Sequence, residues 1–290
     1  MTPAAVSQQI KALEDYLGQR LFRRLTRALE LTPQGLAVWP KVHEAFECLA
    51  AAIESTRRAG VGDGDGDGDG VLTIKAPPSF ASRWLLPRLP QFHRLHPEFE
   101  VRLDSHPDAV DKHGEQTDLE LEPIDPRDAA SVVAIRYGRG DYPAYLVQKI
   151  FAPSCIAVCS PSLLAAMAWK QVPGELSGMA LIQDDTLGAD GGQAAWTQWL
   201  QAVGASEVDA RRGPRFSNAT LAIEAALAGQ GLALAIKPLA EADLASGRLV
   251  APFQTEIPSA FAYYLLIPKA LASRRSILAF GQWLLAAGGG

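Results

Sequence analysis

Apolar residues near the beginning of the chain recur at helical spacing. Thr2 and Pro3 have the form of an N-cap followed by a proline at the first helical position, and Gly18 supplies a stop. The apolar positions that share one helix face between them are Val6, Ile10, Leu13 and Leu17. The spacing predicts an amphipathic helix from Pro3 to Leu17.

Residues 21–31 do not continue the helical spacing of apolar residues. They read LFRRLTRALEL, which holds too many arginines for a core strand and has a polar centre. We predict a short two-stranded ribbon with a basic tip. The arginines that line it are Arg23, Arg24 and Arg27.

A second helix begins at Thr32 and Pro33. Its apolar residues follow the 3–4 alternation of a coiled-coil seam, at Trp39, Val42, Phe46, Leu49 and Ile53. The seam can pack against the rest of the chain or pair with another subunit. We favour pairing, because a glycine–aspartate repeat at 62–70 follows and has the composition of a flexible linker.

After the repeat, strands and helices alternate. A strand is predicted at 71–76, a helix at 79–96 and a strand at 98–103. Similar pairs recur at 155–169 and at 219–236. Strand, helix and strand in succession indicate crossover units and a parallel sheet, so the body is α/β, as one large domain or two smaller lobes.

Composition narrows the class of protein. The chain has 290 residues, of which 48% are hydrophobic and 20% charged, as in a globular protein. No apolar run reaches the roughly 18 residues of a membrane span, and we expect a cytoplasmic protein with no membrane partner. The net charge of −5 divides into about +2 in residues 1–60 and −7 in the remainder, which favours a polyanion contact near the N-terminus.

Catalytic and metal-binding motifs are absent from the sequence. It has no P-loop, dinucleotide fingerprint, GxSxG or HExxH, and Cys48, Cys155 and Cys159 lack zinc spacing. The glycine–aspartate repeat imitates the start of a calcium loop but lacks the terminal glutamate. We therefore expect no enzyme, metal or cofactor.

Two predicted helix starts are more informative. Ser79 follows the first strand of the body, and Ser217 and Asn218 form a strong cap sequence. Helix starts attract carboxylates through free backbone donors, and in open α/β sheets ligands bind beyond the carboxyl ends of strands. Ordinary capping explains either start taken alone.

Several segments resemble LysR-type transcriptional regulators, in the branch of glycine-cleavage activators that also includes regulators of β-lactamase expression. In the head they are TPAAVSQQIKALE (2–14), GQRLFRR (18–24) and LTPQG (31–35). In the body they are PSFASRWLLPRL (78–89), AIRYGRG (134–140), CSP (159–161), GPRF (213–216) and AALAGQG (225–231). The resemblance covers nearly the whole chain.

The resemblance implies a domain order. It gives a partial winged helix-turn-helix at 1–31, with a recognition helix at 3–17 and a wing at 21–31, then a dimerisation helix at 32–58 and a linker at 59–70. A two-lobed, Rossmann-like effector domain similar to periplasmic binding proteins would occupy 71–290. Its first lobe would comprise about 71–148 and 256–290, and its second about 149–255.

It also implies site residues. The major groove of double-stranded DNA would face Pro3, Ala4, Ser7, Gln8 and Lys11, and the wing arginines would lie beside phosphates. The effector cleft would involve Ser79, Arg136, Tyr137, Asn218, Ala219 and Tyr263. Arg136 would complete the charge of an anionic ligand.

The predicted function is a homodimeric or homotetrameric regulator that senses a small metabolite, an amino acid or another carboxylate. Members of the family carry two helices before the recognition helix, and this sequence begins without them. We therefore expect weak DNA binding. The alternative is a truncated, small-molecule-binding protein that does not bind DNA.

Overall fold

The computed structural model describes residues 3–24, 29–39, 41–42, 45, 71–111, 131–167, 173–187 and 191–289. The chain divides into two units, Met1–Gly64 and Asp65–Gly290. Among the described residues, no helix is both long and apolar enough to cross a membrane.

The first unit has the predicted helix and ribbon. Helix α1 spans Pro3–Leu17, and strands β1 (Phe22–Arg24) and β2 (Leu29–Leu31) pair antiparallel. Gly18 ends the helix at a φ of 65°, a conformation that glycine adopts without strain. The Glu14 carboxylate accepts hydrogen bonds from the Leu21 and Phe22 amides, which fixes the ribbon against the helix.

Part of the predicted seam can be seen in the first unit. Residues 33–39, 41, 42 and 45 are helical. Trp39 is 52% exposed and Val42 is 37% exposed, so this part of the seam is open within the unit. Phe46, Leu49, Ile53 and the glycine–aspartate repeat lie outside the described residues.

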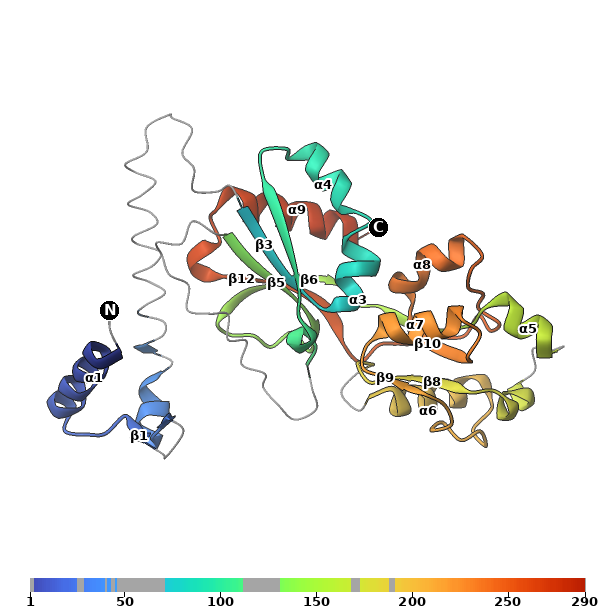
Figure 1. Cartoon of the computed structure of the whole chain (residues 1–290), viewed down its shortest axis with the longest axis horizontal. Helices are drawn as coiled ribbons and strands as arrows, with labels where there is room; N and C mark the ends of the chain where they lie inside the picture. The colour runs from blue at the N-terminus through green and yellow to red at the C-terminus, as the bar shows by residue number, and fades with distance from the viewer. Residues whose placement is uncertain are drawn as a thin grey trace. The chain divides into compact units, whose positions relative to one another are not determined.

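The second unit contains two five-stranded sheets (Figure 1). The first has the order β4-β3-β5-β12-β6. Its strands are β3 (Val71–Ala76), β4 (Glu100–Ser105), β5 (Ser131–Gly138), β6 (Tyr145–Phe151) and β12 (Ala262–Pro268). Its helices are α3 (Pro78–Phe80), the π-helix η1 (Ala81–Leu85), α4 (Leu89–Leu95), η2 (Pro107–Ala109), η4 (Lys269–Leu271) and α9 (Arg275–Gly288).

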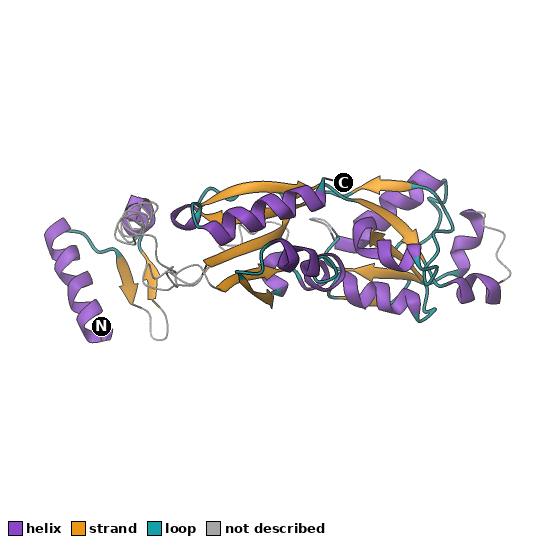
Figure 2. Cartoon of the chain, turned by 90° about the horizontal axis from the view of Figure 1, so that it is seen from above, coloured by secondary structure: helices purple, strands orange, loops and turns teal. Residues whose placement is uncertain are grey.

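The second sheet has the order β11-β7-β10-β8-β9. Its strands are β7 (Ser154–Val158), β8 (Leu181–Asp184), β9 (Arg215–Phe216), β10 (Leu232–Ile236) and β11 (Glu256–Pro258). Its helices are α5 (Pro161–Met167), η3 (Pro173–Gly178), α6 (Gly191–Val203), α7 (Ala219–Leu227) and α8 (Lys237–Ala245). Figure 2 shows helices beside the strands of both sheets.

The prediction of a parallel sheet was wrong in part, because both sheets are mixed. β3 pairs parallel with β4 and β5, as crossover units require, but β12 pairs antiparallel with β5 and β6. In the second sheet β10 is parallel to β8 and antiparallel to β7. In each sheet one strand runs against the others, β12 in the first sheet and β7 in the second.

Two boundaries also differ from the prediction. β6 continues to Phe151, and β11 pairs with β7 in the second sheet, so both crossings come slightly later than 148/149 and 255/256. The predicted helix at 79–96 is divided into α3, η1 and α4. Pro87 and Pro90 lack the amide hydrogens that a continuous helix needs.

Candidate functional site

A cavity of about 80 Å³ lies between the two lobes of the second unit. The first lobe contributes residues from α3, η2, β5 and β12 and the turns beside them, and the second contributes the turn after β8 and the start of α7. The lining consists of Pro77, Pro78, Ser79, Pro107, Val110, Tyr137, Thr186, Ser217, Asn218, Ala219 and Tyr263. Five of the six predicted effector residues are among them, and the sixth, Arg136, is not.

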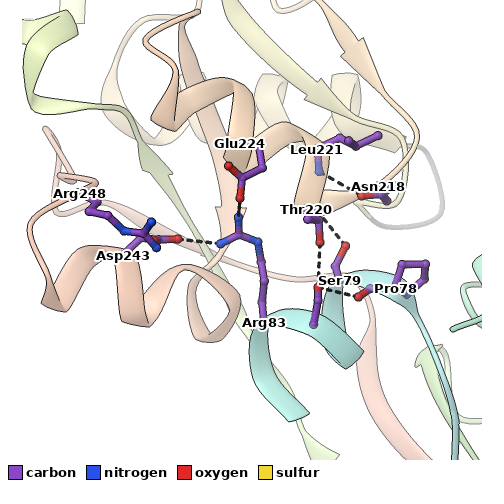
Figure 3. A network of polar contacts seen from close by, with 10 residues as sticks. Pro78, Ser79, Arg83, Asn218, Thr220, Leu221, Glu224, Asp243 and Arg248 are labelled. Carbon is purple, nitrogen blue, oxygen red and sulfur yellow. Dashed lines mark hydrogen bonds and ion pairs between the residues drawn. The ribbon is translucent and has the colours of Figure 1, made fainter. Parts of the chain in front are cut away.

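The start of α7 forms one wall of the cavity. Asn218 is the N-cap, and its side-chain oxygen accepts a hydrogen bond of 3.1 Å from the Leu221 amide. Across the lobe boundary, the Ser79 hydroxyl oxygen accepts a 2.9 Å hydrogen bond from the Thr220 amide (Figure 3). Two first-turn donors of α7 are therefore satisfied within the protein, and one of their acceptors comes from the other lobe.

A charged network joins the lobes beside this wall (Figure 3). Arg83, from η1 in the first lobe, donates to Asp243 on α8 at 2.7 Å and to Glu224 on α7 at 2.6 Å. Arg248 also pairs with Asp243. Asp243 is 1% exposed, so two arginines balance a buried carboxylate.

Two stacked tyrosines form the opposite wall. Tyr137 and Tyr263 are direct partners across β5 and β12, and their ring centroids lie 4.6 Å apart. The Tyr137 hydroxyl lies 2.5 Å from the Ser259 hydroxyl oxygen. Burial raises the pKa of both phenols well above the ordinary value, so both remain neutral at physiological pH.

Arg136 is the predicted effector residue that does not line the cavity. Successive side chains of a strand point to opposite faces, so Arg136 faces away from the cavity that Tyr137 lines. Its Nε donates to Asp111 at 2.6 Å, and Asp111 also accepts from the Tyr142 hydroxyl at 2.8 Å. Arg136 thus pairs with Asp111 on that face of the sheet, and its role in effector binding stays a prediction.

Asp184 is the ionisable group that sequence reasoning missed. It ends β8, is 1% exposed, and accepts hydrogen bonds at Oδ1 from the amide (2.9 Å) and the hydroxyl (2.7 Å) of Thr186. Burial raises its pKa from 3.8 to about 6. Burial is the main cause of the raised pKa of Tyr137 and Tyr263, and the charge of Asp184 adds to it, so Asp184 lies on the side of the tyrosine wall. A carboxylate at the carboxyl end of the buried strand Leu181–Asp184 was the available signal.

The predicted DNA-binding residues lie on α1 and the ribbon of the first unit. Ser7, Gln8 and Lys11 are exposed. Arg23 is exposed and pairs with Glu30 at 2.8 Å. Pro3 and Ala4 lie in the first turn of α1, and Arg24 lies in β1, but the side chains of these three residues are not described. Arg27 lies outside the described residues.

A hollow of about 720 Å³ runs along the same unit. Its lining comes from α1, the turn after it and β1, namely Ser7, Ile10, Lys11, Glu14, Asp15, Gly18, Gln19, Arg20 and Phe22. Val6, Leu13 and Leu17 on α1 are between 42% and 47% exposed. The apolar face predicted from their spacing is thus open to solvent within the described residues.

Comparison with known families assigns both units. A family model for the bacterial regulatory helix-turn-helix protein of the lysR family matches residues 1–36, and one for the LysR substrate binding domain matches residues 65–119 and 133–289. The chain belongs to the LysR family of transcriptional regulators.

The sequences of individual relatives support the same family assignment. The chain is 36% identical over 286 residues to the glycine cleavage system transcriptional activator of Escherichia coli K12, covering 99% of this chain and 85% of that protein. It is 31% identical over 286 residues to the transcriptional activator AmpR of Providencia stuartii, covering 99% of this chain and 87% of the relative.

A solved structure extends the likeness to the fold. The effector domain of the transcriptional regulator AmpR of Pseudomonas aeruginosa is 30% identical, with a TM-score of 0.59, and covers 76% of this chain and 96% of its own. These relatives are named as transcriptional regulators and not as enzymes. In the described part of the chain, no group of three or more His, Cys, Asp or Glu side chains is arranged to hold a metal ion.

Proposed function

We propose that this LysR-type regulator is a cytoplasmic, DNA-binding homodimer or homotetramer whose activity depends on a small carboxylate bound between the two lobes. The observation that carries the proposal is the start of α7, which lines the cavity and is held by a hydroxyl from the opposite lobe. A ligand at this point touches both lobes and can therefore shift their relative arrangement.

The carboxylate would bind at the α7 start. The Ala219 amide lines the cavity and has no hydrogen-bond partner among the described residues. It is the first donor of a nine-residue helix, where the helix dipole favours negative charge. Because Arg136 is engaged elsewhere, the backbone supplies the attraction in place of a side-chain cation.

A thermal-shift screen of small carboxylates tests this site. A ligand that binds the native state raises the melting temperature, by about 2.7 kcal/mol of stability at a hundredfold excess over its Kd. Asn218→Leu, which removes the cap and crowds the helix start, should abolish the shift. Asn218→Ser keeps a capping oxygen and is the matched control. Shifts given by neutral or cationic compounds but by no carboxylate would contradict the proposal.

The DNA contact would use the exposed residues of α1 and the ribbon. Gln8 can read an adenine edge, while Lys11 and Arg23 supply phosphate attraction. We expect Gln8→Ala to change sequence preference and Arg23→Ala to weaken binding to all sequences, with an affinity that falls as salt rises. A chain that binds the effector but no DNA fragment would favour the alternative of a regulator-like sensor.

Self-association would run through the seam of the helix at 32–58. Trp39 and Val42 are exposed at its beginning, and Phe46, Leu49 and Ile53 continue the heptad spacing. Phe46→Asp combined with Leu49→Lys should lower the mass of the oligomer in light scattering. An unchanged mass would move the interface to the effector domain.

A further inference from the structure

The two sides of the cavity differ in hydrogen-bonding character. On the α7 side, the Ala219 amide is a donor without a partner among the described residues. On the β8 side, Thr186 offers an acceptor, because its hydroxyl hydrogen is already donated to Asp184. A molecule that fills the cavity can thus meet both a free donor and an acceptor from the second lobe.

The acceptor side also carries negative charge. Asp184 receives only neutral donors, the amide and hydroxyl of Thr186, and no ion pair among the described residues involves it. The neighbouring Asp185 is exposed and pairs with Arg215 at 2.6 Å, so this arginine is directed to another carboxylate. A buried carboxylate without a cation is costly, as the rise of its pKa to about 6 indicates.

A bound cation would offset that cost. An ammonium group donates hydrogen bonds and carries a positive charge, and Thr186 presents its free lone pairs to the cavity. Among the described residues that line the cavity there is no arginine or lysine.

We infer that the ligand is a small zwitterion, whose carboxylate meets the α7 start at Ala219 and whose ammonium group meets Thr186, with Asp184 behind it. This inference rests on the proposed carboxylate site and adds the second recognition element. The cavity of about 80 Å³ is smaller than most ligand pockets, which favours a molecule with few atoms, such as a free α-amino acid.

The test is a binding series with the full chain. The twenty protein amino acids are screened by thermal shift, and the amino acid with the largest effect is compared with its deaminated acid and its primary amide by calorimetry. We expect the amino acid to bind at least about tenfold more tightly than either analogue, because each lacks one charge-assisted contact.

The outcomes separate the two proposals. Equal binding of the amino acid and its deaminated acid would overturn the ammonium site and leave the carboxylate site standing. Binding of the amide but not of the deaminated acid would overturn the carboxylate site and support the ammonium site. If no amino acid shifts the melting temperature, the zwitterion inference is wrong.

Variants assign the contact to named atoms. Asp184→Asn and Thr186→Val should each reduce amino-acid affinity at least about tenfold while changing the affinity of the deaminated acid little. Thr186→Ser keeps the hydroxyl and should retain binding, and Asp185→Asn is the matched control for a neighbouring exposed carboxylate. Unchanged amino-acid affinity in folded Asp184→Asn protein would overturn the assignment, as would equal losses for the amino acid and its deaminated acid.

Discussion

Two carboxylates in the second lobe are equally buried but differently partnered. Asp184 and Asp243 are each 1% exposed. Asp243 pairs with two arginines, one of them from the other lobe, whereas the partners of Asp184 among the described residues are the amide and hydroxyl of Thr186. The difference separates two roles for a buried carboxylate in one lobe. Asp243 is neutralised by arginines when the chain folds, whereas we propose that Asp184 is neutralised by the ammonium group of a bound ligand.

Replacing the partnered carboxylate should have the largest effect. Asp243→Asn removes the charge that balances Arg83 and Arg248, leaving Arg83, with 12% of its side chain exposed, without a buried counter-charge. We expect a loss of about 3 kcal/mol or more in the free energy of unfolding, measured by urea denaturation. A loss below about 1 kcal/mol would mean that the network is weak.

Replacing Asp184, which has no cationic partner among the described residues, should raise the free energy of unfolding instead of lowering it. Because burial raises the pKa of Asp184 from 3.8 to about 6, the wild-type chain is most stabilised by this group below pH 4 and loses that stability as pH rises through about 6. Asp184→Asn should remove this pH dependence and stabilise the unliganded chain at pH 7.5 by roughly 1–3 kcal/mol. Destabilisation at pH 7.5 would contradict the comparison.

The neutral contact between the lobes should matter less. Ser79→Ala removes the hydroxyl oxygen that accepts the Thr220 amide at 2.9 Å. We expect a loss of about 1 kcal/mol in the free energy of unfolding, because the Thr220 amide can then donate its hydrogen bond to water in the cavity. The measurement is thermal unfolding, with Ser82→Ala as a control, because the contact of Ser82 with Thr220 is longer, at 3.3 Å.

The outer ion pair should contribute least. Glu224, which meets Arg83 at 2.6 Å, has a side chain that is 60% exposed, so water screens the pair. Glu224→Gln should change the free energy of unfolding by no more than roughly half a kcal/mol. An effect comparable to that of Asp243→Asn would show that burial is not what separates the two partners of Arg83.

Local signals in the sequence predicted part of this picture. The bounds of α1, β3 and β10 and the N-cap at Asn218 followed from apolar periodicity and capping residues. Of the cavity residues, Ser79 was marked by its place at a helix start after the first strand, and Tyr263 came from the family resemblance.

Packing determined what the sequence could not reveal. The sequence could not show that Arg136 lies outside the cavity lining, because which face of β5 meets the cavity depends on the pairing of β5 with β12. The contact of Arg83 with Asp243 joins residues 160 positions apart, and no local pattern marks it. Asp184 stands out only when its burial and its lack of a cationic partner among the described residues are both known.

The central claim is that ionised Asp184 receives the ammonium group of the ligand, and the pH dependence of binding tests it most directly. The groups around Asp184 are Thr186, Asp185, Tyr137, Tyr263 and Cys155. Burial raises the pKa of the Cys155 thiol to about 12 and those of the tyrosines further, so none of these three titrates between pH 5 and 7. Asp185→Asn controls for the remaining carboxylate.

The measurement is calorimetric titration of the full chain with its best-binding amino acid at about pH 5, 6 and 7. An α-amino acid keeps both charges over this range. The account predicts that affinity rises as pH increases through about 6 and that Asp184→Asn abolishes the rise. An affinity that is independent of pH in the wild-type chain, or that falls as pH rises, would contradict it.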